Sequence, residues 1–372
     1  MPFSKEREHC IVILGMEEQG LALLHCMHKT HLHVHFFVDR RRPTHAWELS
    51  RHGVRHYFSS LEDLDRQLQE LQHSFPDRLC VFISSANLLT DIRFNLPELY
   101  EKYTVSSSPL HWIDILTTKH LMYDEVVRYG AKTAPFRMLR DYKKGDLAFP
   151  LVLKRDVEYV LSFKTRRADT QDELEAFVKE MPDNPDQVIV QEMVTPEAKD
   201  YSLHAYVHQG VLLGSVAFEE VRHYPTGISS YLEELPDSLS EELVAETEKF
   251  LSHTDYCGFI QIDFKYLPEG SALIMDVNTR TPGSHSAFYR KFSNWKAFYA
   301  ALPEKPVRLI PRKKRIRWIN VVRDLVGTKA KGQVVQSFKD MFGAYWDVFD
   351  WGDPRPFFQT FLLIIRQRHA EF

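Results

Sequence analysis

The stretch IMDVNTRTPGS, residues 274–284, places an acid, an amide and a cation on a segment that otherwise resembles a buried strand. Because alternate side chains of a strand share a face, Asp276, Asn278 and Arg280 are predicted to point the same way. The opposite face would then carry Met275, Val277 and Thr279. This pattern predicts a polar site at the end of a strand.

A second acid lies on the strand-like segment that precedes this stretch. Asp263 is in GFIQIDFKY, residues 258–266, and a turn at Pro268 to Gly270 separates this segment from ALIMDVNTR, residues 272–280. If the two segments pair as a hairpin, Asp263, Asp276 and Asn278 project into one cleft. Two carboxylates and an amide suit Mg²⁺, with Mn²⁺ as the alternative metal. For either acid alone, a solvated position on an exposed face is the competing interpretation.

The first hundred residues alternate strand-like and helix-like segments. Apolar runs at residues 10–15, 33–39 and 79–85 predict a parallel sheet covered on both faces. The loop from Gly15 to Gly20 lacks the GxGxxG spacing of a dinucleotide site, so a structural turn is favoured there over a nicotinamide site.

The chain from Pro150 onward has a different pattern. Strand-like segments at 149–156 and 186–194 flank a helix predicted at 170–181, with Thr170 as its N-cap. A hairpin is expected to turn at Gln209-Gly210, and a helix follows before the acidic hairpin. The fold class is therefore α/β followed by α+β.

Composition restricts the functional classes. Hydrophobic residues make up 44% of the 372 residues, charged residues 26%, and the formal net charge is -4, so no nucleic-acid partner is expected. The four cysteines form no CxxC pair, and the N-terminus is charged, which favours a cytoplasmic protein. No apolar run is long enough for a transmembrane segment.

The pair of acidic segments resembles the metal-binding end of the ATP-grasp superfamily, which includes biotin carboxylase, D-alanine and D-aspartate ligases, and carbamoyl-phosphate-synthase-like proteins. In that family one acid lies on a strand and a motif of the form acid-x-Asn-x-Arg lies on the next. Here Asp263 is followed by Asp276, Asn278 and Arg280. The resemblance implies a Rossmann-like pre-ATP-grasp domain at 1–115 and an ATP-grasp domain at 116–305 with a lid at about 135–195. A C-terminal extension at 306–372 would pack on the core.

The resemblance also implies nucleotide contacts. Lys119 matches the lysine that opens the ATP-grasp domain, and Lys154 matches the strand lysine that contacts the phosphates of ATP. Glu192 and Val194 lie where the family's adenine-binding hinge is expected. Asp200 matches the ribose-binding position by spacing, with Glu197 as the alternative.

One segment departs from the family pattern. The family usually covers the phosphates with a glycine-rich loop, whereas residues 155–167, RDVEYVLSFKTRR, contain no glycine. Either Ser162, Lys164 and Thr165 replace that loop, or closure over the nucleotide is altered. This departure keeps a non-catalytic or regulatory ATP-binding protein as the alternative function.

The activity implied is that of an ADP-forming carboxylate–amine ligase. ATP would activate a small-molecule carboxylate as an acyl phosphate, and an amine would then attack it; an amino acid is expected as one substrate. Arg280 would face the transferring phosphoryl group. Arg222 lies on a segment that approaches the same centre in related ligases, with a surface arginine on a hairpin as the alternative. In the turn after Arg280, backbone amides at Gly283 and Ser284 are expected to contact the substrate carboxylate, with a plain turn as the alternative.

Two interpretations remain for the C-terminal part of the chain. The basic run at 312–317 could bind an anionic substrate, a membrane surface or RNA. Its alternation with the apolar residues Ile316 and Trp318 favours a strand with one solvent-exposed face. The amphipathic tail is expected to pack on the domain, with peripheral membrane contact as the alternative. A homodimer is the expected oligomeric state.

Overall fold

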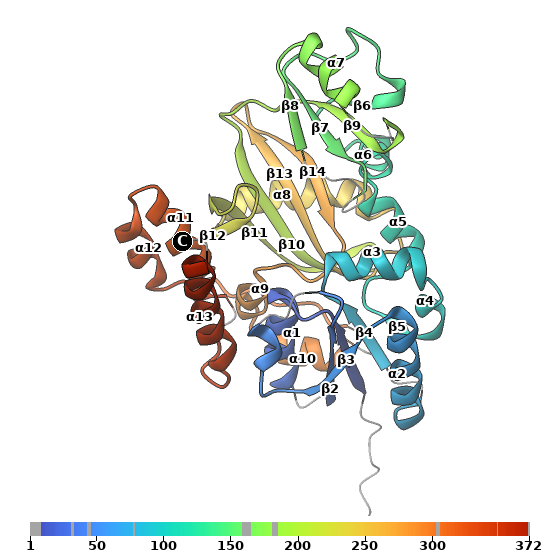
Figure 1. The fold of residues 1–372 in the computed structure, drawn as a ribbon, viewed down its shortest axis with the longest axis vertical. Helices are drawn as coiled ribbons and strands as arrows, with labels where there is room; N and C mark the ends of the chain where they lie inside the picture. Colours follow the sequence, from blue (N-terminus) through green and yellow to red (C-terminus); the bar gives the residue numbers. More distant parts are fainter. Residues whose placement is uncertain are drawn as a thin grey trace, which may run out of the picture.

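The computed structural model describes residues 9–30, 33–42, 46–76, 79–157, 165–180, 185–302, 306–347 and 349–370. Within this part of the chain, three sheets are stacked along the long axis of the molecule (Figure 1). Ser162 and Lys164, which replace the glycine-rich loop in one of the two interpretations, lie outside the described residues.

The N-terminal sheet is wholly parallel, as the apolar runs predict. Its strand order is β3-β2-β1-β4-β5, and its strands are β1 (Cys10–Leu14), β2 (His33–Asp39), β3 (Val54–Phe58), β4 (Leu79–Ile83) and β5 (Thr104–Val105). Alternate residues of β1 enter two different cores, since Val12 packs in one and Ile13 in the other. The sheet is therefore covered on both faces.

Short helices complete this N-terminal unit. They are α1 (Glu18–His28), the 3-10 helix η1 (Ala46–Leu49), α2 (Leu61–Ser74), α3 (Ala86–Asn95) and α4 (Leu99–Lys102). Helix α1 is buried over nearly its whole length because it packs against α9 (His285–Lys291) and α10 (Trp295–Ala301) as well as the sheet. The N-terminal sheet is thereby joined to the rest of the molecule through a shared core.

A small antiparallel sheet forms a separate lobe, which we call the lid (Figure 1). Its order is β6-β9-β7-β8, with β6 (Phe136–Met138), β7 (Leu151–Arg155), β8 (Thr165–Ala168) and β9 (Val188–Glu192). It has its own core, in which Leu153 packs with Leu174 of α7 (Gln171–Glu180). The 3-10 helices η2 (Leu139–Asp141) and η3 (Pro185–Gln187) complete it. The predicted cap is present, since Thr170 Oγ1 accepts the Glu173 N–H at 3.3 Å.

The large sheet carries the acidic hairpin. Its order is β14-β13-β10-β11-β12-β15-β16, with β10 (Lys199–His208), β11 (Val211–His223), β12 (Ser229–Glu234), β13 (Gly258–Leu267), β14 (Ser271–Asn278), β15 (Arg317–Ile319) and β16 (Tyr345–Trp346). Helices α5 (Leu110–Thr117), α6 (Lys119–Arg128) and α8 (Asp237–Leu251) lie beside it. The hairpin turn predicted at Gln209-Gly210 is present, and both residues have positive φ.

The C-terminal segment extends this sheet. Strand β15 pairs with β12, and β16 pairs with β15. Helices α11 (Val321–Ala330) and α12 (Val334–Met341) lie between β15 and β16 in the chain, and α13 (Arg355–Ala370) follows β16. Asp353 contacts His25 and Ser50 of the N-terminal unit. In the part of the chain that the structure describes, no helix is long and apolar enough to cross a bilayer. The domain boundaries at 115 and 305 stay a prediction.

Candidate active site

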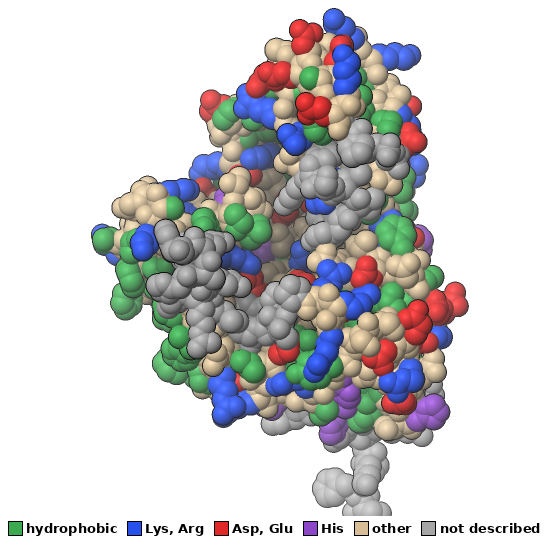
Figure 2. Space-filling model, viewed as in Figure 1, with side chains coloured by type: hydrophobic (Ala, Val, Ile, Leu, Met, Phe, Trp, Pro, Cys, Tyr) green, Lys and Arg blue, Asp and Glu red, His purple; other side chains and the backbone are tan. Residues whose placement is uncertain are grey.

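Two cavities meet at the acidic hairpin, where the surface is hollowed between the lid and the C-terminal helices (Figure 2). The larger, of about 650 Å³, lies between the lid and the large sheet. The second, of about 330 Å³, lies between the large sheet and the first turn of α1. Asp263, Asp276 and Glu220 line both cavities, so these carboxylates stand at the boundary between them.

The two aspartates face each other across neighbouring strands. Asp263 of β13 and Asp276 of β14 are register partners. Gln261 and Asn278, two residues further along the hairpin on the same face, are also paired. Asp263 Oδ1 accepts from Gln261 Nε2 at 2.8 Å, and Asn278 Nδ2 lies 3.4 Å from Asp263 Oδ2. The predicted hairpin is confirmed, and it brings the three predicted metal ligands together.

A bulge in β14 changes one prediction. The register shifts between Asp263 and Phe264, which leaves Met275 as an extra residue opposite this step. Met275 therefore lines the larger cavity beside Asp276, and the expectation that it points away from the acids is wrong. Asp276, Asn278 and Arg280 share the wall of the second cavity, as predicted.

The charges of the two aspartates are unequal. Burial, reinforced by the nearby carboxylates of Glu220 and Asp276, raises the pKa of Asp263 well above its usual range. Burial also opposes ionisation of Asp276, but Lys119 outweighs this effect and lowers the pKa of Asp276. A divalent cation would relieve the repulsion between the two carboxylates, so their chemistry fits Mg²⁺.

The protein supplies only part of a coordination shell at this place. Among the described residues, no group of three or more histidine, cysteine, aspartate or glutamate side chains is arranged to hold a metal. Two carboxylates and an amide leave most positions around an ion open. Mg²⁺ is usually bound in this way, with phosphate oxygens and water completing the octahedron.

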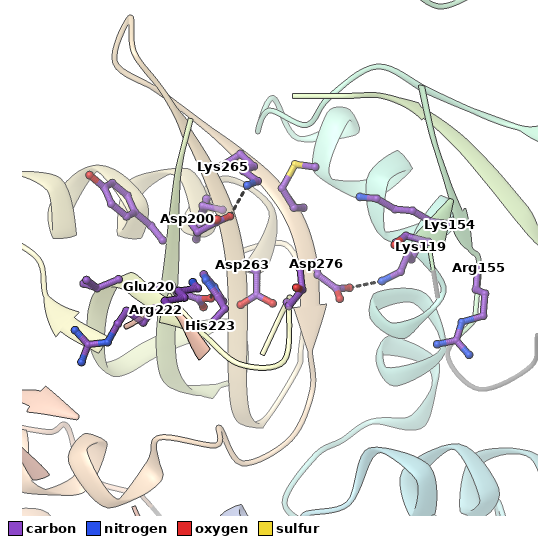
Figure 3. A pocket seen from close by; sticks show the side chains of 18 residues that line it. Lys119, Lys154, Arg155, Asp200, Glu220, Arg222, His223, Asp263, Lys265 and Asp276 are labelled. Carbon is purple, nitrogen blue, oxygen red and sulfur yellow. Dashed lines mark hydrogen bonds and ion pairs between the residues drawn. The ribbon is translucent and has the colours of Figure 1, made fainter. Parts of the chain in front are cut away.

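The lid side of the larger cavity is cationic (Figure 3). Lys119 Nζ lies 2.6 Å from Asp276 Oδ1, and Lys154 Nζ donates to Gln191 Oε1 at 2.7 Å. Burial, together with the charge of Lys119, lowers the pKa of Lys154 to about 7. Arg155 and Thr165 also line this wall.

The residues predicted to bind the nucleoside of ATP lie in two different environments. Asp200 lines the larger cavity and pairs with Lys265 at 2.6 Å, whereas Glu197 lines neither cavity. Glu192 and Val194 also lie outside both linings. Glu192 accepts the Ala148 N–H at 2.8 Å and donates its own N–H to the Pro135 carbonyl at 2.9 Å, so its polar groups are used within the lid.

The two predicted catalytic arginines differ in their partners. Arg280 lines the second cavity, and its Nε is buried without a hydrogen-bond partner. Arg222 lines the larger cavity, but its guanidinium forms a fork on Asp324 at 2.8 and 2.9 Å and reaches Asp340 at 2.7 Å. Arg280 is therefore available to an anion, whereas Arg222 is held by carboxylates of the C-terminal segment.

His204 and Glu220 also line the site, although the sequence did not predict them. His204 is buried in the wall of the second cavity, where its Nδ1 is 2.7 Å from the Oγ of Ser284 and its Nε2 has no partner. Burial lowers its pKa to about 4, so the ring is neutral at pH 7. Glu220 accepts from His223 and Ser229, and these bonds outweigh burial and lower its pKa. The alternation of Asp200, Ser202 and His204 along β10 is the signal that was overlooked.

Comparison with known proteins identifies the fold. No protein-family model matches the sequence, and the search of curated proteins found no match. Carboxyaminoimidazole ribonucleotide synthase from Aspergillus clavatus, solved with ATP, superposes with a TM-score of 0.64 at 16% identity, over 85% of this chain and 82% of that one. The L-amino acid ligase of Bacillus licheniformis gives 0.61 at 15% identity, over 82% and 76%.

A carboxylase domain is also similar. The biotin carboxylase domain of 2-oxoglutarate carboxylase from Hydrogenobacter thermophilus, solved with MgADP, ADP and bicarbonate, gives a TM-score of 0.62 at 12% identity, over 81% of this chain and 71% of that one. These identities are too low to carry an activity from one chain to another. The superpositions confirm the fold class predicted from the acidic hairpin: the chain has the ATP-grasp fold of these ligases and carboxylases.

Proposed function

We propose that this protein is an ATP-dependent, ADP-forming ligase that joins a carboxylate to an amine. The observation that carries the proposal is the meeting of the two cavities at Asp263 and Asp276. A triphosphate in the larger cavity would place its terminal phosphate beside a carboxylate in the second cavity. Repulsion between these two anions is the main obstacle to reaction, and cations at their contact would reduce it.

Each charged group between the two cavities has a proposed role in reducing this repulsion. Asp263, Asp276 and Asn278 would hold Mg²⁺, which neutralises phosphate charge when bound. Lys119 and Lys154 would bind phosphate oxygens from the side of the lid. In the free protein Lys119 is paired with Asp276, so a bound ion and phosphates would redistribute an existing pair of charges.

The reaction would proceed in two transfers. The substrate carboxylate takes the terminal phosphoryl group of ATP, which forms an acyl phosphate and releases ADP. The amine nitrogen then attacks the acyl carbon, and phosphate leaves. Arg280, whose Nε has no partner, would bind the anionic oxygens in the second cavity, and Ser284 would lie beside the carboxylate through its contact with His204.

Other parts of the proposal rest on sequence resemblance and on structural neighbours. An amino acid is the proposed partner substrate, and a neighbour of the same fold is an L-amino acid ligase. Asp200, Glu192 and Val194 remain the proposed contacts of the nucleoside. A catalytic role for Arg222 stays a prediction. We further propose a cytoplasmic homodimer.

A product screen tests the function. The protein is incubated with Mg·ATP and pools of amino acids, dipeptides and small carboxylates, and nucleotides, phosphate and new amides are measured. We expect ADP, phosphate and an amide in equal amounts. Formation of AMP and pyrophosphate would contradict the proposed reaction. Nucleotide binding without turnover in any pool would favour a regulatory ATP-binding protein.

A further inference from the structure

Two helices of the C-terminal segment expose apolar stripes to solvent. On α12 and its C-cap, Val335, Phe338 and Phe342 are 69%, 52% and 80% exposed. On α13, Phe358, Phe361 and Leu362 are 57%, 41% and 44% exposed. Each set follows helical spacing, so each forms one stripe on its helix. Single exposed apolar residues are ordinary, but two such stripes indicate an interaction surface.

An aromatic cluster connects the two stripes. Trp346 Nε1 donates to the Met341 carbonyl at the end of α12, and the Trp346 ring lies 5.5 Å from that of Phe349. Phe349 in turn contacts Trp351 at 4.9 Å and Phe357, at the start of α13, at 5.2 Å between ring centroids. Trp351 is 89% exposed.

We call the seven exposed side chains the C-terminal apolar surface: Val335, Phe338, Phe342, Trp351, Phe358, Phe361 and Leu362. Figure 2 shows hydrophobic side chains gathered over the C-terminal helices on this side of the molecule. The surface is continuous with a packed core, because Phe357 and Met341 are buried beneath it. It is therefore held in place by its support rather than projecting on a loose tail.

The C-terminal segment that carries this surface is rich in cations. Residues 306–372 contain 13 lysines and arginines but only 6 aspartates and glutamates, although the whole chain has a net charge of -4. Five of the six acids are buried, with at most 7% exposure, namely Asp324, Asp340, Asp347, Asp350 and Asp353. The sixth, Glu371, lies outside the described residues.

The buried acids have partners inside the protein. Asp324 and Asp340 hold Arg222, Asp350 holds Lys29, and Asp353 contacts His25 and Ser50. Exposed cations of the segment include Lys339 on α12 and Arg355 at the start of α13. Within the described part of this segment, no acid is left to balance them at the surface.

We propose that the C-terminal apolar surface docks the protein on membranes that contain anionic lipids, as a peripheral contact independent of the ligase reaction. Aromatic side chains would enter the interface between headgroups and acyl chains, and Lys339 and Arg355 would meet the negative headgroups. The combination of apolar stripes with flanking cations is typical of helices that lie on a membrane surface.

The charge distribution disfavours a symmetric dimer at this surface. In a two-fold interface the same patch meets itself, so Lys339 and Arg355 would approach their own copies or other cations. A nucleic acid would match the charge but would leave Val335 and Leu362 without an apolar partner. An anionic bilayer satisfies both the charge and the apolar stripes.

Vesicle co-sedimentation tests the proposal with the full chain. We expect about tenfold more protein bound to vesicles of phosphatidylcholine with phosphatidylserine than to phosphatidylcholine alone. The double variant Phe342→Ser/Trp351→Ser should lower this binding about tenfold or more, because each ring contributes buried apolar area. Both side chains are exposed, so the thermal unfolding and the Mg·ATP binding of the variant should match those of the wild type.

A control variant removes one exposed aromatic ring elsewhere. Phe94→Ser changes a side chain that is 56% exposed on α3, outside the C-terminal apolar surface, and it should leave vesicle binding unchanged. The proposal is overturned if the protein binds vesicles with phosphatidylserine no better than vesicles of phosphatidylcholine alone. It is equally overturned if the double variant binds phosphatidylserine vesicles as well as the wild type. It is also overturned if the double variant only dissociates a dimer, or only abolishes binding to an RNA probe.

Discussion

The side chain of Lys154 is the clearest case in which one residue makes the site sensitive to pH. Burial and Lys119 lower its pKa to about 7, so in the free protein it loses its proton near neutral pH. Bound phosphates would favour the charged form and raise this pKa again. Binding of Mg·ATP above pH 7 should therefore take up a proton at Lys154, and below pH 7 it should not.

Calorimetry in buffers of different ionisation enthalpy measures this uptake. We expect up to one proton more for the wild type than for Lys154→Arg at pH 8, since arginine stays charged in both states. At pH 6 the difference should disappear. Equal proton uptake by the two proteins at pH 8 would show that Lys154 does not gain charge on binding.

Asp263 illustrates a conflict between stability and function at one residue. Because its pKa is raised in the folded state, folding takes up a proton there, and stability falls as the pH rises from the unfolded value of 3.8 through the folded pKa. Asp263→Asn removes this cost and keeps an acceptor for Gln261. Each pKa unit corresponds to about 1.4 kcal/mol.

We therefore expect Asp263→Asn to be more stable than the wild type at pH 7.5 in EDTA, with a difference that shrinks towards pH 3.8. Its Mg²⁺-dependent nucleotide binding should be weaker. Thermal unfolding measures the first effect. Asp255→Asn, which changes a side chain that is 66% exposed, is the control. A less stable Asp263→Asn protein would mean that Asp263 is not under electrostatic strain.

At the scale of elements, the contact of β11 with α11 and α12 depends on Arg222. Asp324 is fully buried and accepts from Arg222, Ser230 and Ser337, and Asp340 is nearly buried beside it. Removing the cation would leave two carboxylates in an environment where ionisation is costly. Arg222→Met should therefore destabilise the protein by about 3–5 kcal/mol.

Urea unfolding checks this value, and limited proteolysis shows whether the C-terminal segment is released. The double variant Arg222→Met/Asp324→Asn should recover part of the loss, because one uncompensated carboxylate is gone. If Arg222→Met keeps its stability but loses turnover, the residue acts in the reaction and not as an anchor.

The elements also show why the hairpin could be predicted and its bulge could not. Alternation of polar and apolar residues predicts which face Asp276 shares with Asn278 and Arg280, and the structure agrees. A bulge depends on where the register with the partner strand shifts, and the sequence of β14 alone does not encode this position. Met275 was therefore misplaced by a pattern that is correct for its neighbours.

At the scale of the whole molecule, the predicted fold is confirmed because it depends on local signals in order along the chain. Buried runs predict the parallel sheet, and the acid-x-Asn-x-Arg motif predicts the second fold. His204 and Glu220 were not predicted as site residues, because strand pairing between distant parts of the chain brings β10 and β11 to the site. The partners of Arg222 lie about a hundred residues away, so no local pattern could indicate them.

The larger cavity and the acidic hairpin support one account of the molecule, in which paired aspartates present Mg²⁺ to a nucleotide. Calorimetry of ATP binding with Mg²⁺ and with EDTA tests this account without knowledge of the other substrates. We expect Mg²⁺ to tighten ATP binding at least about tenfold in the wild type and in Asp255→Asn, and this gain to be lost in Asp276→Asn. Equal ATP affinity with Mg²⁺ and with EDTA, or a full gain in Asp276→Asn, would contradict the assignment of the two aspartates.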